Sequence, residues 1–310
     1  MIHPKINPII LREIRSRMRR RQTFFGLTGY VVGLGALVWS FYAIFYYSNV
    51  IYNYNNLPAS NAQYGSEIGK VIFISITLLM LMIFPFNAVA FVSDAIAGER
   101  ERQTYEILRI TTMSTFQLVS GKLGAVFIFL VLYLLLALPI QALSFLFGGV
   151  TMGEVFIATI AVLVTGLTFA ALGIYISSLA RTAKMATAIS TSLIILFVYV
   201  VPIIIWLLIL LAPPFISDLL SGRTWLSLLL VVYGGGLLAS LNPLGAAILT
   251  SVAAADGKGY FLFTITDTIQ SGPVTLWVIS PWLVYVFSYS LLALLFVFLT
   301  TKRLSKLSVM

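Results

Sequence analysis

Six continuous apolar stretches dominate the sequence, and each is long enough to cross a lipid bilayer as an α-helix. They cover residues 23–47, 71–93, 123–150, 155–180, 186–211 and 274–301, and none contains Asp, Glu, Lys, Arg or His. A helical span needs about 20 apolar residues, because the helix rises about 1.5 Å per residue. Transmembrane β-strands would instead alternate in polarity over about ten residues. The pattern therefore predicts an all-α integral membrane protein with six transmembrane helices in a single domain, residues 1–310.

A seventh uncharged stretch, residues 224–255, differs from the other six. Gly234-Gly235-Gly236 and Asn242-Pro243 interrupt it, which leaves outer pieces of roughly ten residues each. Such a piece is about 15 Å long as a helix, half of a membrane. We expect a re-entrant or interfacial helical hairpin between the fifth and sixth spans, with a seventh complete crossing as the alternative.

The basic residues predict the orientation of the chain. Cytoplasmic flanks of membrane spans are rich in Lys and Arg. With six spans and an inside N-terminus, all but Lys70, Arg223 and Lys258 of the 19 Lys and Arg residues lie inside. A seventh crossing would move the basic C-terminal cluster outside. We therefore expect a multi-pass protein of the cytoplasmic membrane with both termini inside.

Composition and charge narrow the classes of function. With 60% hydrophobic and 9% charged residues, the chain is neither an ordinary soluble protein nor disordered. The net charge of +9 is explained by orientation and by contact with anionic membrane lipids, so no nucleic-acid partner is needed. The chain has no Cys and one His, His3, which argues against a metal centre.

No residue pattern supports an activity within the chain itself. The glycine-lysine pairs lack the spacing and the hydroxyl residue of a phosphate-binding P-loop. The six spans contain no ionisable group for a proton relay or for intramembrane catalysis. We therefore expect a non-enzyme that binds no cofactor and takes its energy from another subunit.

Two segments predicted to lie on the cytoplasmic side have residue patterns that simple loops lack. The first, within residues 1–22, places Ile10, Leu11 and Ile14 at helical spacing among arginines that include Arg12, Arg15 and Arg19. It predicts an amphipathic elbow helix in the headgroup region, with a plain topology signal as the alternative.

The second segment, residues 94–122, combines a mixed-charge run with apolar residues. Ala97-Gly98 predict a break after the second span, and Ser114 predicts a helix start. Positive-inside orientation does not require the acids here, which suggests ion pairs or a partner surface. The alternative is a solvated loop with internal salt bridges worth about 0–1 kcal/mol each.

This second segment resembles the permeases of type-2 ABC exporters. The resemblance rests on Gly98–Leu108, then Thr111–Ser114, then Gly121-Lys122, and on the elbow residues Asn7-Pro8-Ile9 and Arg12-Glu13. In topology it covers the whole chain. The sequence differs at Gln103, where the family often has Gly, and at Thr112, where it often has Pro, which leaves the local turn geometry open.

The resemblance implies partners and a contact region. Residues 94–122 would form the coupling region that docks on an ABC ATP-binding subunit, which would hold ATP and Mg. A second permease subunit, identical or related, would complete the transporter. The contact residues implied are Glu99, Arg100, Glu101, Thr104, Glu106 and Leu108, with the turn at 181–184 as a weaker candidate.

Small and polar residues within the spans suggest further sites. Gly29 and Gly33 form a small-xxx-small pattern that suits a dimer contact or a contact within the subunit. Asn87, Gln141, Thr165 and Thr168 are candidates for a substrate path, although hydrogen bonds between helices are the commoner use. An uncharged path favours a hydrophobic or amphipathic cargo. The alternative function is a non-transporting membrane scaffold within a larger complex.

Overall fold

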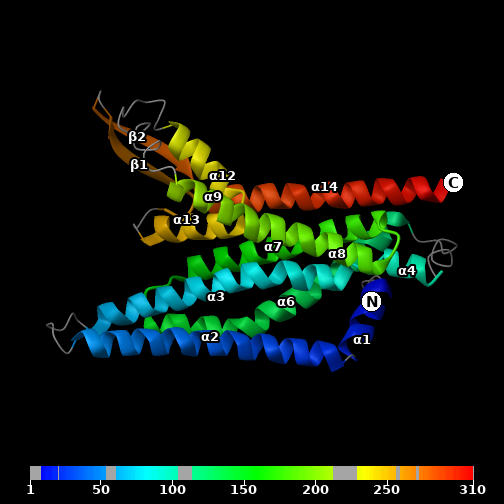
Figure 1. The fold of residues 1–310 in the computed structure, drawn as a ribbon, viewed down its shortest axis with the longest axis horizontal. Helices are drawn as coiled ribbons and strands as arrows, with labels where there is room; N and C mark the ends of the chain where they lie inside the picture. The colour runs from blue at the N-terminus through cyan, green and yellow to red at the C-terminus, as the bar shows by residue number, and fades with distance from the viewer. Residues whose placement is uncertain are drawn as a thin grey trace, which may run out of the picture.

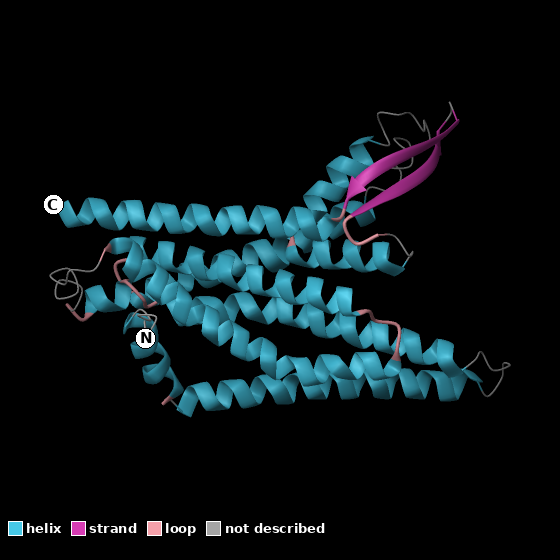
Figure 2. Cartoon of the chain, turned by 180° about the vertical axis from the view of Figure 1, so that it is seen from behind, coloured by secondary structure: helices cyan, strands magenta, loops and turns pink. Residues whose placement is uncertain are grey.

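The protein is a bundle of long helices with a small β-hairpin at one end (Figure 1, Figure 2). The computed structural model describes residues 8–19, 21–53, 61–103, 114–211, 229–255, 259–269 and 272–309. In these ranges, six helices are long and apolar enough to cross a membrane. Helix α1 and the C-terminal end of α14 lie at the same end of the bundle, and the β-hairpin lies at the opposite end.

The helices follow the predicted apolar stretches closely through the fifth span. The first half of the chain forms α1 (Pro8–Met18), α2 (Arg21–Asn53), α3 (Asn61–Val92), α4 (Ala97–Glu101), α6 (Thr115–Phe147) and α7 (Met152–Leu179). The fifth span is continuous through α8 (Ala183–Ile194), the π-helix η1 (Ile195–Val200) and α9 (Val201–Leu211). The second half adds η2 (Leu230–Gly235), α12 (Gly236–Ser240), α13 (Pro243–Ala255), β1 (Leu262–Ile269), β2 (Gly272–Ile279) and α14 (Pro281–Val309).

The β-hairpin corrects two sequence predictions: the fold is not entirely α-helical, and the sixth span begins at Pro281 rather than at residue 274. Strands β1 and β2 pair antiparallel, with Leu262 opposite Ile279. Thr, Val, Ile and Trp favour strands. In β1, threonine recurs at every second position from Thr264 to Thr268, whereas β2 is mostly apolar from Val274 and reads along the sequence as part of a longer apolar run. Proline suits the first position of a helix, so α14 starts where β2 ends.

The core of the bundle lies where α7 packs against both α3 and α14 (Figure 1). Phe84 on α3 and Ile174 on α7 are fully buried there. Glycine permits α7 to approach α3 and α6 closely. A Cβ on Gly173 would lie 2.7 Å from Val92 Cγ2, and one on Gly166 would lie 2.8 Å from Leu130 Cδ1. Small residues at such positions are typical of helix packing in lipid.

The segment predicted as a helical hairpin forms two helical pieces that meet at Asn242. The glycines at 234–236 continue the helix from η2 into α12, so the only break described within 229–255 is the turn before Pro243. Residues 224–228 lie outside the described residues, and the depth of this hairpin in the membrane stays a prediction.

Asn242 also explains how the fifth span tolerates Pro202. Proline has no backbone N–H, so the carbonyl five residues earlier, that of Phe197, loses its donor in the π-helical stretch. Asn242 Nδ2 donates to that carbonyl at 2.8 Å, while its Oδ1 accepts from the Leu244 N–H at 2.9 Å. One buried side chain thus supplies a donor to the free carbonyl in the fifth span and caps the start of α13.

We predict that Asn242→Asp lowers the stability of the protein by about 1–3 kcal/mol, because it leaves the Phe197 carbonyl without its donor. The carboxylate retains an acceptor for Leu244. The midpoint of thermal unfolding in detergent measures the effect. Ser240→Ala is the control, since the Ser240 hydroxyl bonds to Gly236 O within its own helix. Equal midpoints for the two variants would contradict the role of Asn242.

Candidate functional site

The end of the bundle that carries α1 and α4 is strongly basic, and we call it the basic end. It is defined by the exposed side chains of Arg12, Arg15, Arg19, Arg102, Arg181, Lys184, Lys302, Arg303 and Lys306. The three arginines predicted for the elbow are among them. The described parts of the predicted coupling region, residues 94–103 and 114–122, lie at this end as well (Figure 1).

The helix break in this region comes earlier than the sequence suggests. Residues 93–96 form the turn, and Ala97-Gly98, predicted to be the break, instead begin α4. The hydroxyl of Ser177 on α7 stabilises this geometry by accepting from the N–H groups of Ile96 at 3.1 Å and Ala97 at 3.0 Å. A side chain from a distant helix therefore supplies the acceptor that the interrupted helix lacks.

Three of the predicted contact residues bind other helices of the same chain. Glu99 Oε1 lies 2.7 Å from Lys122 Nζ on α6. Arg100 Nη1 donates to Ala180 O, directly after α7, at 3.3 Å. Glu101 Oε2 accepts from the Ala183 N–H, in the first turn of α8, at 3.2 Å. Together they hold α4 against three spans. Thr104, Glu106 and Leu108 lie outside the described residues.

Lys122 is the buried cation of the site, and its partner could not be identified from the sequence. Its side chain is only 6% exposed, and Nζ also donates to Ala95 O at 2.6 Å. A buried charge is tolerated when it is both paired and hydrogen-bonded, as here. The only sign of this ion pair in the sequence is that Lys122 directly precedes the apolar stretch 123–150 and that acidic residues are concentrated in the segment before it.

A second missed residue, Arg17, attaches α1 to the bundle. Arg17 Nη2 donates to Phe91 O at 2.6 Å, and the guanidinium lies over the Phe91 ring, 5.1 Å from its centroid. Glu13 pairs with Arg17 at 3.3 Å one helical turn earlier. On the same helix, Ile10 packs so closely on Gly124 that a Cβ there would lie 2.9 Å from Ile10 Cδ1.

Gln103 ends α4 in the left-handed region, with φ of 57°. Its N–H donates to Arg100 O at 3.1 Å, and the Arg102 N–H donates to Gly98 O at the same distance. This is the position where the resembled family often has Gly, the residue that adopts positive φ without steric cost. The turn therefore has the backbone that a glycine would favour, although the side chain differs.

The small residues predicted for a dimer contact face away from the bundle. Gly29 and Gly33 on α2 are exposed, and a Cβ on either would meet no atom within 4 Å in the described part of the chain. This stripe is free to approach another molecule, and its use in a dimer stays a prediction.

The polar residues predicted for a substrate path lie among the helices of one subunit. Thr165 bonds to the Tyr285 hydroxyl, and Thr168 Oγ1 donates to Tyr289 O at 3.0 Å, so both join α7 to α14. Gln141 Nε2 is 3.7 Å from Met80 Sδ. Asn87, on α3, is half-buried. Thr165, Thr168 and Gln141 therefore form hydrogen bonds between helices.

The comparisons with known proteins bear on these features as a whole. A family model described as "ABC-2 family transporter protein" matches residues 8–296. No curated protein sequence matches the chain. The matched range contains α1, the basic-end contacts of α4, and the first five candidate spans with most of the sixth.

We predict that Gln103→Gly stabilises the protein by about 1 kcal/mol, because an L-residue in the left-handed region costs about 1–2 kcal/mol. Chemical or thermal unfolding in detergent measures the change. The matched control is Arg102→Gly, where φ is −84° and glycine brings only its entropic cost. A destabilisation of similar size in both variants would show that the turn is not strained.

We predict that Lys122→Met destabilises the protein by about 3 kcal/mol, because it leaves the Glu99 carboxylate without its cation. Adding Glu99→Gln should recover part of the loss, so a double-mutant cycle on unfolding midpoints should show strong coupling. Arg102→Met removes an exposed cation from the same region and should change stability by no more than about 0.5 kcal/mol. Additive effects of the two changes would mean that the ion pair is unimportant.

Proposed function

The chain belongs to the ABC-2 family of transporter proteins, and from this we propose that it is the membrane permease subunit of an ATP-driven exporter. Permeases of this family are membrane transport components, which generally work with an ATP-binding subunit and as dimers. The proposed cargo is a hydrophobic or amphipathic molecule that moves outward across the cytoplasmic membrane, with both termini of the permease inside.

The observation that carries this proposal is the attachment of α4. The short helix is bound to α6 through Glu99 and to the α7–α8 junction through Arg100 and Glu101. A force applied to α4 by a neighbouring subunit would therefore reach three spans without an intervening flexible segment. This is the mechanical property that a coupling region needs.

We place ATP and Mg in the partner subunit. The glycine-lysine pair at 121–122 is not followed by the hydroxyl residue of a P-loop. The Lys122 ammonium is also buried between Glu99 and Ala95 O, where it is engaged within the protein. ATP binding and hydrolysis in the partner subunit would supply the movement, and α4 would transmit it to the spans.

The docking surface we propose is centred on the first turn of α6 beside α4. Phe116 there is 62% exposed, and Arg102 and Gln103 are exposed at the end of α4. Aromatic side chains, phenylalanine included, and arginine are enriched at protein interfaces. The second permease subunit would approach the side of α2 that carries Gly29 and Gly33, close to the exposed Trp39.

We predict that Phe116→Ala lowers the affinity for the ATP-binding subunit at least tenfold, because it removes an interface anchor worth about 1.4 kcal/mol or more. The test is copurification in mild detergent, followed by ATPase assays of the complex in nanodiscs. Phe127→Ala is the matched control, since Phe127 is also exposed on α6 but lies about 16 Å further along the helix.

Recovery of a stable assembly without any ATP-binding chain would overturn the exporter proposal in favour of a membrane scaffold. Equal ATPase activity of the two phenylalanine variants would leave an ABC transporter but place the docking surface elsewhere.

A further inference from the structure

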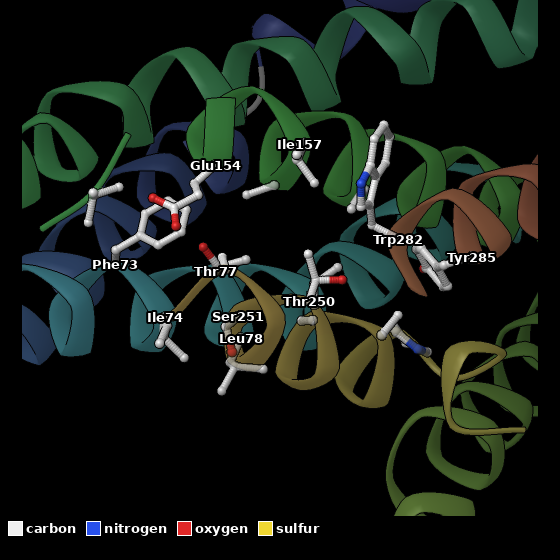
Figure 3. A pocket seen from close by; sticks show the side chains of 18 of the residues that line it. Phe73, Ile74, Thr77, Leu78, Glu154, Ile157, Thr250, Ser251, Trp282 and Tyr285 are labelled. Carbon is white, nitrogen blue, oxygen red and sulfur yellow. The ribbon is translucent and has the colours of Figure 1, made fainter. Parts of the chain in front are cut away.

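The end of the bundle opposite the basic end contains a cavity of about 110 Å³ between α3, α7, α13 and α14 (Figure 3). Its walls are mainly apolar, with Phe73, Ile157 and Trp282 among the lining residues. None of the residues suggested earlier for a substrate path lines it. The cavity belongs to one subunit and is separate from the exposed side of α2.

The lining residues are ordered by polarity along the helix axes. On α3, Lys70, Thr77 and Leu81 line the cavity in sequence, and about 16 Å separates the first from the last. On α7, Glu154 lies at the same end as Lys70, and Ala161 lies about 10 Å further into the bundle. Charged groups therefore mark one end, and apolar side chains surround the other.

Two buried hydroxyl groups lie between these ends. Thr77 on α3 is 6% exposed, and its Oγ1 has no hydrogen-bond partner among the described residues; the same holds for the buried Oγ1 of Thr250 on α13. Figure 3 shows the two side chains in the middle of the cavity, on different helices. Threonines on α7 behave differently, since Thr159 Oγ1 donates to Val155 O at 2.8 Å.

Unpartnered buried hydroxyls are costly, and a mainly apolar cavity offers a water molecule few other partners. An alkane would fill the space but leave both hydroxyls unsatisfied. A bound molecule that carries an oxygen between an apolar chain and a charged head satisfies both features. The volume of about 110 Å³ encloses only a stretch of one chain, which favours a single-chain molecule over the two chains of a diacyl lipid.

The charges at the polar end identify the head. Lys70 is exposed there, and Glu154 is half-buried with Oε2 accepting from the Thr151 N–H at 2.7 Å. The structure describes no ion pair between the two side chains, so each can meet an opposite charge. A cation and an anion side by side complement a head that carries both a phosphate and an ammonium group.

We propose that this cavity binds one molecule of a single-chain zwitterionic amphiphile of the lysophospholipid type. A stretch of the chain occupies the apolar end, and a hydroxyl or ester oxygen meets Thr77 and Thr250. The phosphate lies near Lys70 and the ammonium near Glu154. The proposal concerns binding by the permease alone, and it does not depend on the proposed function.

The test is a titration of the purified full-length protein in detergent with palmitoyl lysophosphatidylethanolamine, followed by native mass spectrometry. We expect one saturable site per chain. Thr77→Val combined with Thr250→Val should weaken binding at least tenfold, because two hydrogen bonds are lost. Thr159→Val is the matched control and should bind as the wild type does. If the double variant fails to fold, Thr250→Val alone should weaken binding about fivefold.

Two further variants test the place and the head. Ala158→Phe should abolish binding, because Ala158 is buried and lines the cavity, whereas Ala36→Phe on the exposed side of α2 should not. Lys70→Gln with Glu154→Gln should weaken lysophosphatidylethanolamine about fivefold but leave binding of hexadecanol unchanged.

Wild-type affinity in both the threonine double variant and Ala158→Phe would place the lipid elsewhere and overturn the proposal. So would the absence of saturable binding to the wild type together with a higher melting temperature of the threonine double variant, which would indicate a cavity that contains water only.

Discussion

The structure depends on one constraint of the lipid environment: a backbone group freed by a helix interruption has no water to bind and needs a partner from the protein. Each of the main interruptions is resolved by a side chain from a distant part of the chain. Ser177 accepts from the amides freed after α3, and Asn242 donates to the carbonyl freed by Pro202. Irregular backbone and long-range contact therefore occur together, because the first requires the second.

Several hydrogen bonds and an ion pair between separate helices lie at the basic end. The turn after α3 is bound by α7, the following α4 is bound by α6 and α8, and Arg17 of α1 binds a carbonyl at the end of α3. A solvated loop with local salt bridges was the simpler interpretation of these charges. The structure gives an ion pair and hydrogen bonds that join α4 to separate helices.

Much of the fold could be predicted from the sequence, because length and continuous hydrophobicity define a membrane helix almost regardless of context. The helix start at Ser114 was predicted equally well, since its capping bond to the Gln117 N–H is local. The β-hairpin was missed, because Val274–Ile279 is short, apolar and adjacent to a true span. The partners of Glu99 and Lys122 were missed for a different reason: they are 23 residues apart, and spacing alone does not bring them together.

The bonds between α7 and α14 have a consequence for how the protein is made. The buried Tyr285 hydroxyl finds its partner in Thr165, which is 120 positions earlier in the chain. Because these two residues are so far apart in the chain, the bond between α7 and α14 forms only after α14 has been synthesised. Membrane insertion of the earlier spans and final assembly are thus separate events, and a nascent chain in between exposes the flank of α7 to lipid or to an insertion factor.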